Sequence, residues 1–230
     1  MTVAMADNSL PVSVVTALYL RTKTLHVEAE RTGIIRDLLR GEASLEGYII
    51  LLRNLLPAYE AMEKGLERHR GSPGLAALAN FRLDRASAIE ADLVELCGQG
   101  WKRDIPLLNA GDIYARRVAK AAEGDGMRLI AHAYTRYLGD LSGGQILQRL
   151  LTRSLQLKPA ELTFYDFPQF SDLAVLKTDF RHALDAAGAR AADPQAVIEE
   201  GAIAFSLNID LSCAVQALLS SGRIATAAAE

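Results

Sequence analysis

The sequence predicts an all-α protein with a single domain. Apolar residues recur at the three- and four-residue spacing of amphipathic helices almost everywhere, and strict alternation of apolar and polar residues is absent. The chain has 230 residues, of which 50% are hydrophobic and 23% charged, so it can bury a substantial core. We expect seven or eight helices in one domain over 1–230, with flexible ends at 1–10 and 222–230.

Apolar stripes give the helices in chain order. The stripes are Val15, Leu18, Leu25 and Ala29; Leu45, Tyr48, Ile49, Leu52, Leu55, Leu56, Tyr59, Met62 and Leu66; Leu75, Leu78, Phe81, Ile89, Leu93 and Leu96; and Leu173, Leu176, Phe180 and Leu184. A last helix is expected from about Pro194 to Leu219. No repeat of about 33 to 45 residues is visible, which argues against a stacked helical-repeat protein.

Capping residues predict where these helices begin and end. Helix N-caps, two of them with proline in the first turn, are expected at Ser44, Ser72-Pro73 and Asp193-Pro194. Glycines suited to helix ends are Gly41, Gly71, Gly98, Gly100 and Gly188.

Composition excludes several classes of protein. A formal net charge of −3 gives no sign of nucleic-acid binding, which usually needs a strongly basic face. The longest uncharged stretches, such as 8–20 and 211–222, fall short of the ~18 apolar residues of a membrane span. The first residues do not resemble a secretory signal, so we expect a cytoplasmic protein without a membrane partner. The two cysteines, Cys97 and Cys213, are expected to be inert core thiols.

The run Ala131 to Leu147 has a helical pattern but contains three glycines. Each glycine inside a helix costs about 1 kcal/mol relative to alanine, so something must compensate. In one interpretation, Ser142 to Gln145 is a loop with a capping box. In the other, Gly139 and Gly143 share a helix face and let the backbone approach a flat ligand. Asp140 between them either holds water over that face or is a solvated surface acid.

The four histidines lack the spacing of a zinc site. His26 stands out because Glu30, one helical turn later, could accept the second ring N–H, as in many metal-ligating histidines. The alternative is a structural histidine. His132 has a neighbouring Tyr134 and no comparable partner. Lys177 and Arg181 are four residues apart on one helix, and they either grip carboxylates or form an ordinary solvated edge.

Three segments resemble the haem oxygenase family over nearly the whole chain. Tyr134 to Leu147 (YTRYLGDLSGGQIL) is similar to the family's distal-helix signature, Thr24 to Glu30 (TLHVEAE) to its proximal helix, and Phe205 to Ile209 (FSLNI) to its C-terminal helix. The resemblance implies an all-α fold in which haem b lies between a proximal helix and a kinked, glycine-rich distal helix. Haem would be both cofactor and substrate, with O₂ as co-substrate.

The resemblance also implies roles for individual residues. His26 would be the axial ligand of the haem iron, oriented by Glu30. Gly139, Gly143 and Gly144 would lie against the porphyrin, and Asp140 would organise a distal water chain. That chain would be extended by Arg136, Tyr59, Tyr114 and Asn208, and the propionates would be held by Tyr134, Lys177 and Arg181. One departure is Tyr19, which replaces a lysine that relatives often use as a propionate anchor; Lys23 is nearby.

The activity implied is oxidative cleavage of haem to biliverdin, Fe²⁺ and CO, with cleavage favoured at the α-meso carbon. Because no Rossmann GxGxxG or flavin motif is present, electrons must come from a separate ferredoxin, flavodoxin or reductase. Two alternatives stay open: a non-catalytic haem- or bilin-binding protein on the same fold, and a helical interaction module without haem.

Overall fold

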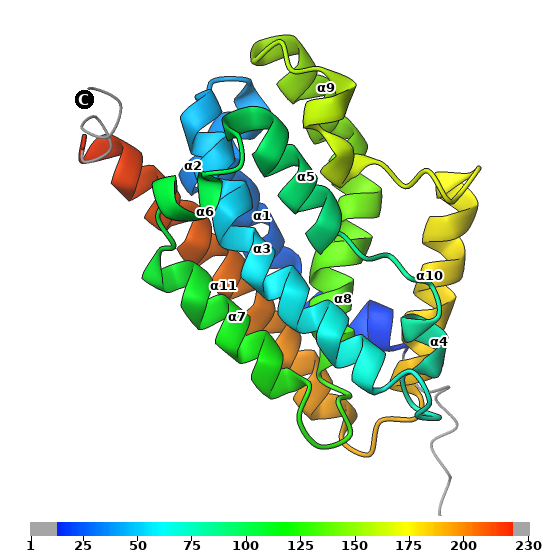
Figure 1. Cartoon of the computed structure of the whole chain (residues 1–230). Helices are drawn as coiled ribbons and strands as arrows, with labels where there is room; N and C mark the ends of the chain where they lie inside the picture. The colour runs from blue at the N-terminus through cyan, green and yellow to red at the C-terminus, as the bar shows by residue number, and fades with distance from the viewer. Residues whose placement is uncertain (1–12, 223–230) are drawn as a thin grey trace, which may run out of the picture.

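A computed structural model describes residues 13–222 as a bundle of helices (Figure 1), and that range contains no β-strand. The all-α prediction is confirmed. The α-helices are α1 (Val14–Arg31), α2 (Gly33–Arg40), α3 (Leu45–Arg68), α4 (Ala76–Ala79), α5 (Ala86–Cys97), α6 (Trp101–Asp104), α7 (Asn109–Ala121), α8 (Leu129–Ala133), α9 (Gln145–Ser154), α10 (Leu173–Gly188) and α11 (Pro194–Ser220). Two π-helices, η1 (Tyr134–Leu138) and η2 (Asp140–Gly144), and two short 3-10 helices, η3 (Pro159–Glu161) and η4 (Thr163–Tyr165), complete the elements.

Several of the predicted caps lie where the sequence put them. Ser44 Oγ accepts a hydrogen bond from Gly47 N, and the Asp193 side chain accepts one from Ala196 N. Gly41 ends α2 with a φ of +70°. The expected cap at Ser72-Pro73 is wrong, because α4 begins only at Ala76 and Ser72 Oγ instead closes a turn by accepting from Leu75 N.

Two other expectations need correction. The apolar stripe from Leu75 to Leu96 belongs to two helices, α4 and α5, because Arg82 takes a φ of +52° and interrupts it. Both cysteines are exposed rather than buried, since their apolar sequence neighbours lie on the other faces of α5 and α11. The expected flexible ends lie outside the described residues except for Gly222.

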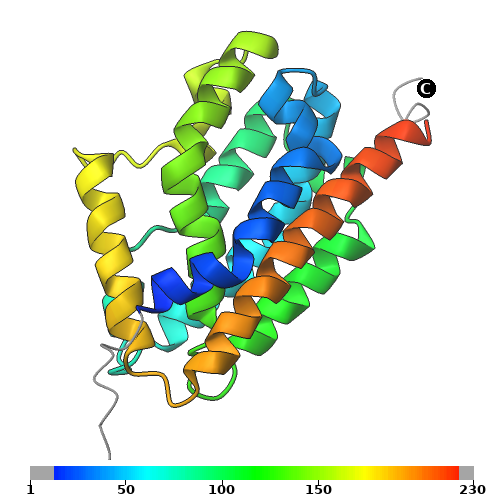
Figure 2. The ribbon, with the colours of Figure 1, turned by 180° about the vertical axis from the view of Figure 1, so that it is seen from behind.

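The core lies around α3 and α11. α3 packs against α5 and α7 (Figure 1), and α11 packs against α1, α2, α7 and α8. Seen from behind, α11 lies beside α1 on one side and α7 on the other (Figure 2). Large side chains such as Tyr48, Tyr59, Tyr114 and Phe180 are fully buried in this core.

Contrary to the sequence expectation, α11 is long and apolar enough to cross a membrane, with a mean hydropathy of 1.6 over 18 residues. It is the one helix within residues 13–222 that meets this test. α11 packs against α1, α2, α3, α7 and α8, and 33% of that 18-residue window is buried within the bundle.

Candidate active site

The glycine-rich run is helical throughout. α8, the two π-helical segments and α9 follow one another from Leu129 to Ser154 without a loop, and Gly139 between the π segments keeps helical angles (φ −63°, ψ −48°). The capping-box interpretation is therefore wrong: Ser142 Oγ donates to Leu138 O at 2.6 Å, and Gln145 Nε2 donates to Tyr165 O at 2.9 Å. We call Leu129–Ser154 the distal helix. π-Helical turns are typical of functional sites, because they shift the backbone out of the regular register.

Two of the three glycines face open space. A Cβ atom added at Gly139 or Gly143 would meet no atom within 4 Å, whereas one added at Gly144 would lie 3.1 Å from the Tyr165 ring. The missing side chains at Gly139 and Gly143 thus leave the distal helix bare on one face.

That bare face lines two adjoining cavities of about 240 and 820 Å³. Both are lined by His26, Thr135, Gly139 and Phe205, so together they separate α1 and α11 from the distal helix. The smaller cavity continues along apolar side chains to Arg136, Asp140 and Gly144, and Glu30 also lines it. The larger one continues to Tyr19, Lys23, Tyr134, Lys177 and Arg181. The site therefore has an apolar middle, a polar inner end and a cationic outer end.

His26 stands on α1 at the junction of the two cavities. Its Nδ1 lies 3.6 Å from Glu30 Oε1, and its ring lies 5.7 Å from that of Phe205. Its side chain is 58% exposed, so the alternative of a histidine buried in the core is wrong. With Nδ1 turned to Glu30, Nε2 is the nitrogen left to meet a ligand.

Asp140 belongs to a buried hydrogen-bond network drawn from α3, α7, α11 and the distal helix. It is only 7% exposed, so the solvated-acid alternative is also wrong. The Tyr59 hydroxyl donates to Asp140 Oδ2 at 2.5 Å and accepts from Arg136 Nε at 2.9 Å. Arg136 also donates to Asn208 Oδ1 at 2.7 Å, and Asn208 Nδ2 donates to the Tyr114 hydroxyl at 2.8 Å. All five residues that the family resemblance named for the distal network are thus connected.

The electrostatics of this network favour proton exchange at Asp140. Burial raises the pKa of the Asp140 carboxyl, and the nearby Arg136 guanidinium offsets only part of that rise. Burial alone would lower the pKa of Arg136, but Tyr59 and Asp140 outweigh it and leave the pKa raised. Arg136 therefore stays a cation, while Asp140 takes up a proton more readily than a solvated aspartate.

The outer end of the site gathers the predicted anchors. Lys177 and Arg181 from α10, Tyr134 from the distal helix, and Tyr19 and Lys23 from α1 all line the larger cavity. Burial raises the pKa of the Tyr134 hydroxyl, against a smaller lowering by Thr22 and Arg181. Tyr134 is therefore a neutral hydrogen-bond donor, and the lysines and arginine supply the positive charge at this end.

Some residues of the site were missed in the sequence. Phe205 and Thr135 lie within the motifs that were recognised, yet neither was given a role. His132, for which no partner was expected, lies 3.0 Å from Glu200 Oε1, and Arg117 also pairs with Glu200. The sequence signal for this partner was Glu200 itself, an acidic residue on the apolar stripe of α11, three residues after Val197 and four before Ala204.

The residues present fit a haem group. A flat apolar ligand needs a bare backbone, which Gly139 and Gly143 provide, and the iron of such a ligand needs an accessible imidazole, which His26 provides. Its two carboxylates need cations at one edge, where Lys177 and Arg181 lie.

Comparison with known proteins agrees with this fit. The family model described as Heme oxygenase matches residues 12–214. The chain is 34% identical to Heme oxygenase 1 of Nostoc over 195 residues, covering 84% of this chain and 82% of that protein. It is also 34% identical to human Heme oxygenase 1 over 215 residues, covering 92% of this chain and 75% of that protein.

Solved structures give the same result. Heme oxygenase-1 of Synechocystis, determined in complex with heme, has a TM-score of 0.85 and 30% identity, covering 92% of this chain and 96% of that one. The heme oxygenase of Leptospira interrogans has a TM-score of 0.82 and 32% identity, covering 88% of this chain and 99% of that one. By family model, sequence and fold, the chain belongs to the haem oxygenase family.

Proposed function

We propose that this protein binds haem b and cleaves it to biliverdin, Fe²⁺ and CO, using O₂ and electrons from a separate donor. The observation that carries the proposal is that a histidine and a bare helix face lie on opposite sides of one cavity. His26 stands on one side, and the bare face of Gly139 and Gly143 with the buried Asp140 network stands on the other.

His26 would bind the haem iron through Nε2, while Glu30 near Nδ1 fixes the orientation of the ring. When bound, haem supplies both the iron at which O₂ is activated and the ring that is oxidised. Gly139, Gly143 and Gly144 would let the distal helix press against the ring and direct O₂ towards one meso edge.

Asp140 would hold water at the distal side and pass protons to the reacting oxygen. Its hydrogen bond with Tyr59 and its proximity to Arg136 fix the carboxylate in place. A carboxyl group with a raised pKa holds a proton more readily than a solvated aspartate, which suits a general acid in this position.

The cationic end of the cavity would hold the haem propionates. Charge-assisted hydrogen bonds from Lys177 and Arg181 contribute about 1.5 to 3 kcal/mol each and also select the rotation of the ring in its plane. We propose α-meso cleavage, because both cations are present beside Tyr134. Tyr19 would donate a hydrogen bond without charge.

The electrons would come from a ferredoxin, a flavodoxin or a dedicated reductase. The sequence has no dinucleotide- or flavin-binding motif of its own. We propose that the protein acts in the cytoplasm, without a nucleic-acid or membrane partner.

Haem reconstitution tests the proposal. We expect about one haem per chain with the Soret band of a histidine-ligated iron, and conversion to a single bilin isomer when reductant and O₂ are supplied. Chromatography of the product identifies the meso position. Absence of a Soret band on titration would leave only a helical interaction module, and bound haem without bilin would leave a non-catalytic haem-binding protein.

Asp140→Ala tests the proton-handling role within the same assay. We expect haem binding to persist and bilin formation to fall by about 10² or more, the usual contribution of a general acid. The matched control is Asp210→Ala, which removes an exposed carboxylate from α11 and leaves turnover unchanged. Equal bilin yields from the two variants would contradict the role of Asp140.

A further inference from the structure

Gly144 differs from the other two glycines of the distal helix in what lies next to it. A Cβ atom at Gly139 or Gly143 would meet no atom of residues 13–222 within 4 Å, but one at Gly144 would lie 3.1 Å from Cδ1 of Tyr165. Carbon atoms in ordinary van der Waals contact are about 3.5 to 4.0 Å apart. The distal helix therefore rests directly against the Tyr165 ring, and a residue without a side chain permits this close approach.

Tyr165 belongs to the short segment 163–166, which we call the support segment. This segment is bonded to the distal helix on both sides of the Tyr165 ring. Gln145 Nε2 donates to Tyr165 O at 2.9 Å, and Gln148 Nε2 donates to Asp166 Oδ1 at 2.7 Å. Together with the glycine contact, these bonds join the support segment to the distal helix at three points.

Asp92 of α5 holds the support segment from the opposite side. Its Oδ1 accepts from the backbone N–H and the hydroxyl of Thr163, at 2.8 and 2.6 Å, and its Oδ2 accepts from Phe164 N at 2.9 Å. The Asp92 side chain is fully buried, and Arg85 Nη1 adds a bond to Phe164 O at 3.3 Å. Three hydrogen bonds to one buried carboxyl group fix the backbone of this segment firmly.

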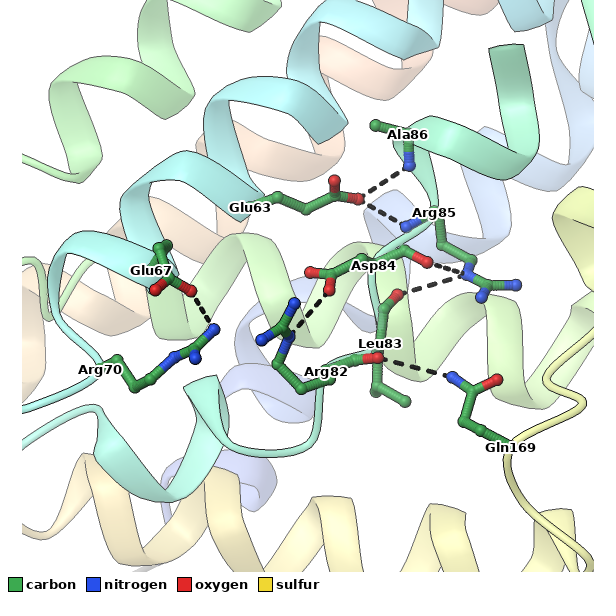
Figure 3. A network of polar contacts seen from close by, with 9 residues as sticks. All are labelled: Glu63, Glu67, Arg70, Arg82, Leu83, Asp84, Arg85, Ala86 and Gln169. Atoms are coloured by element: carbon green, nitrogen blue, oxygen red, sulfur yellow. Dashed lines mark hydrogen bonds and ion pairs between the residues drawn. The ribbon is translucent and has the colours of Figure 1, made fainter. Parts of the chain in front are cut away.

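α5 is in turn fixed to the core of the bundle. It packs against α3, and its first turn is held by Glu63 of α3 (Figure 3). Glu63 Oε1 accepts from the backbone N–H groups of Arg85 and Ala86, at 2.5 and 2.8 Å. The Phe164 ring also packs edge-on against Tyr59 of α3, with 5.5 Å between the ring centroids. The support segment therefore has little freedom to yield when the distal helix presses on it.

The distal helix needs a support of this kind because its glycines give it little packing of its own. Gly139 and Gly143 have no side chain that could hold the helix on the cavity side, and the π-helical turns around them are less regular than an α-helix. Tyr165 lines the smaller cavity together with both glycines. A shift of the distal helix at Gly144 therefore changes where the bare face lies relative to His26.

We propose that Tyr165, held by Asp92 and packed against Gly144, is a positioning residue that sets the distance between the bare glycine face and the haem. The inference rests on the proposed haem cleavage and deepens it. Lys177 and Arg181 would hold one edge of the haem, but their side chains are long and flexible and cannot fix how closely the distal helix approaches the ring. The support segment fixes this distance, and with it the meso carbon that O₂ reaches.

The first experiment needs no haem and compares Gly144→Ala with Gly143→Ala. The two positions are adjacent, but the new Cβ enters open space at Gly143 and meets the Tyr165 ring at Gly144. We expect the urea midpoint of the haem-free protein to rise in Gly143→Ala, because alanine favours the helix, and to fall in Gly144→Ala, because the ring cannot yield. A midpoint of Gly144→Ala at or above that of the wild type would overturn the proposal.

Tyr165→Leu, which removes the ring, tests whether this contact is the cause. In the Tyr165→Leu background, Gly144→Ala should no longer lower the urea midpoint, whereas Gly143→Ala should have the same effect as in the wild type. Tyr165→Phe retains the ring, so Gly144→Ala should still lower the midpoint in that background. An equal loss from Gly144→Ala in all three backgrounds would overturn the contact. The comparison of the two single alanine variants keeps its meaning even if Tyr165→Leu does not fold.

The second experiment is chromatography of the bilin isomers, a readout that a purely structural role would not change. We expect one isomer from the wild type, and a mixture formed about tenfold more slowly by Gly144→Ala, Tyr165→Leu and Asp92→Asn. The control is Glu95→Gln, which changes an exposed carboxylate of α5 and should form one isomer. One isomer from every variant would overturn the positioning role and leave haem cleavage standing. A wild type that forms no bilin would overturn both.

Discussion

His26 illustrates what a single residue contributes to this site. Its side chain is more than half exposed because it lines both cavities of the site. A residue that served the core would be covered by its neighbours. His26 instead contacts Phe205 on one side and faces Glu30 with Nδ1. This arrangement orients the ring and leaves Nε2 available to bind a ligand.

We therefore predict that His26→Ala retains the fold and loses the haem ligand. The helical circular dichroism and the urea midpoint should stay unchanged, while haem affinity falls by at least about tenfold, or 1.4 kcal/mol. Added imidazole should restore the histidine-type spectrum and part of the turnover. His182→Ala, which removes an exposed histidine of α10, is the control and should behave as wild type. Unfolding of His26→Ala would return this residue to a structural role.

At this scale, the sequence could name His26, Glu30 and Asp140 but could not describe their surroundings. The partner of Asp140, Tyr59, is 81 positions away, and the partner of His132, Glu200, is 68 positions away. Helical periodicity tells which residues share a face, but the groups that meet this face belong to other helices. For this reason Asp140 could be read as a surface acid and His132 as a residue without a partner.

Among the elements, the distal helix allows the effect of a residue on stability to be separated most clearly from its effect on function. Gly139 and Gly143 lie in helical backbone with open space where a side chain would be. A glycine inside a helix destabilises it by about 0.5 to 1 kcal/mol relative to alanine. Natural selection for stability alone would favour alanine at both positions, so the bare face serves something other than the fold.

We predict that Gly139→Ala and Gly143→Ala stabilise the haem-free protein by up to about 1 kcal/mol and weaken haem binding and bilin formation. The new methyl group would project into the cavity. Urea unfolding and haem titration measure the two effects separately. The control is Gly201→Ala in α11, where the added Cβ would lie 2.4 Å from Leu18 Cδ2 and should destabilise the protein. Haem affinity equal to wild type in both distal variants would contradict the proposed contact.

The sequence predicts those helix boundaries that are set by residues close to them in the chain. Ser44, Gly41 and Asp193 could be recognised in the sequence because a cap acts on backbone groups within a few residues. The separation of α4 from α5 could not, because α5 begins where Arg85 and Ala86 donate to Glu63 of a different helix. The spacing of apolar residues likewise could not predict the π-helical turns, because it indicated only a helix with three unexplained glycines.

Glu200 joins three elements from the inside of the bundle. It stands on α11, accepts from Arg117 Nε of α7 at 2.7 Å, and contacts His132 Nε2 of α8 at 3.0 Å. Burial by itself would raise the pKa of Glu200, but the hydrogen bonds from His132 and Arg117 outweigh it and lower the pKa to about 2. The charged form of Glu200 is therefore the one that the folded state prefers.

We predict that Glu200→Gln lowers the unfolding free energy by about 3 kcal/mol at pH 7, because it leaves the Arg117 guanidinium and the buried His132 ring without the carboxylate that they contact. Since the folded pKa lies below the ordinary value of 4.5, this stabilisation is complete above pH 4.5 and is lost as the pH falls towards 2. Urea unfolding at several pH values should show a smaller acid dependence in the variant. Glu199→Gln, in an exposed pair with Arg21, should change little, and equal effects of the two substitutions would contradict this prediction.

At the scale of the whole molecule, the bundle divides its apolar residues between two tasks. α5 and α7 bury theirs against α3, whereas α1, α2, α3, α11 and the distal helix leave part of theirs to line the cavities. The sequence predicted the all-α class and the general order of the long helices, because both follow from periodicity. The cavity is not visible in periodicity, since an apolar residue that meets a ligand has the same spacing as one that meets the core.

Haem should consequently complete the packing of the protein and stabilise the folded state. A ligand that binds only the folded state stabilises it by about 2.7 kcal/mol when its free concentration is a hundred times Kd. For a chain of this length, each kcal/mol corresponds to roughly 2–4 °C, so we expect Tm to rise by roughly 5–10 °C on saturation with haem. Calorimetry with and without haem measures the shift. His26→Ala should have the Tm of the wild type without haem and a smaller rise with it. If saturation with haem, as judged by the Soret band, left the wild-type Tm unchanged, haem would be binding the unfolded chain as tightly as the folded one, which would contradict a site formed by the folded cavity between α1 and the distal helix.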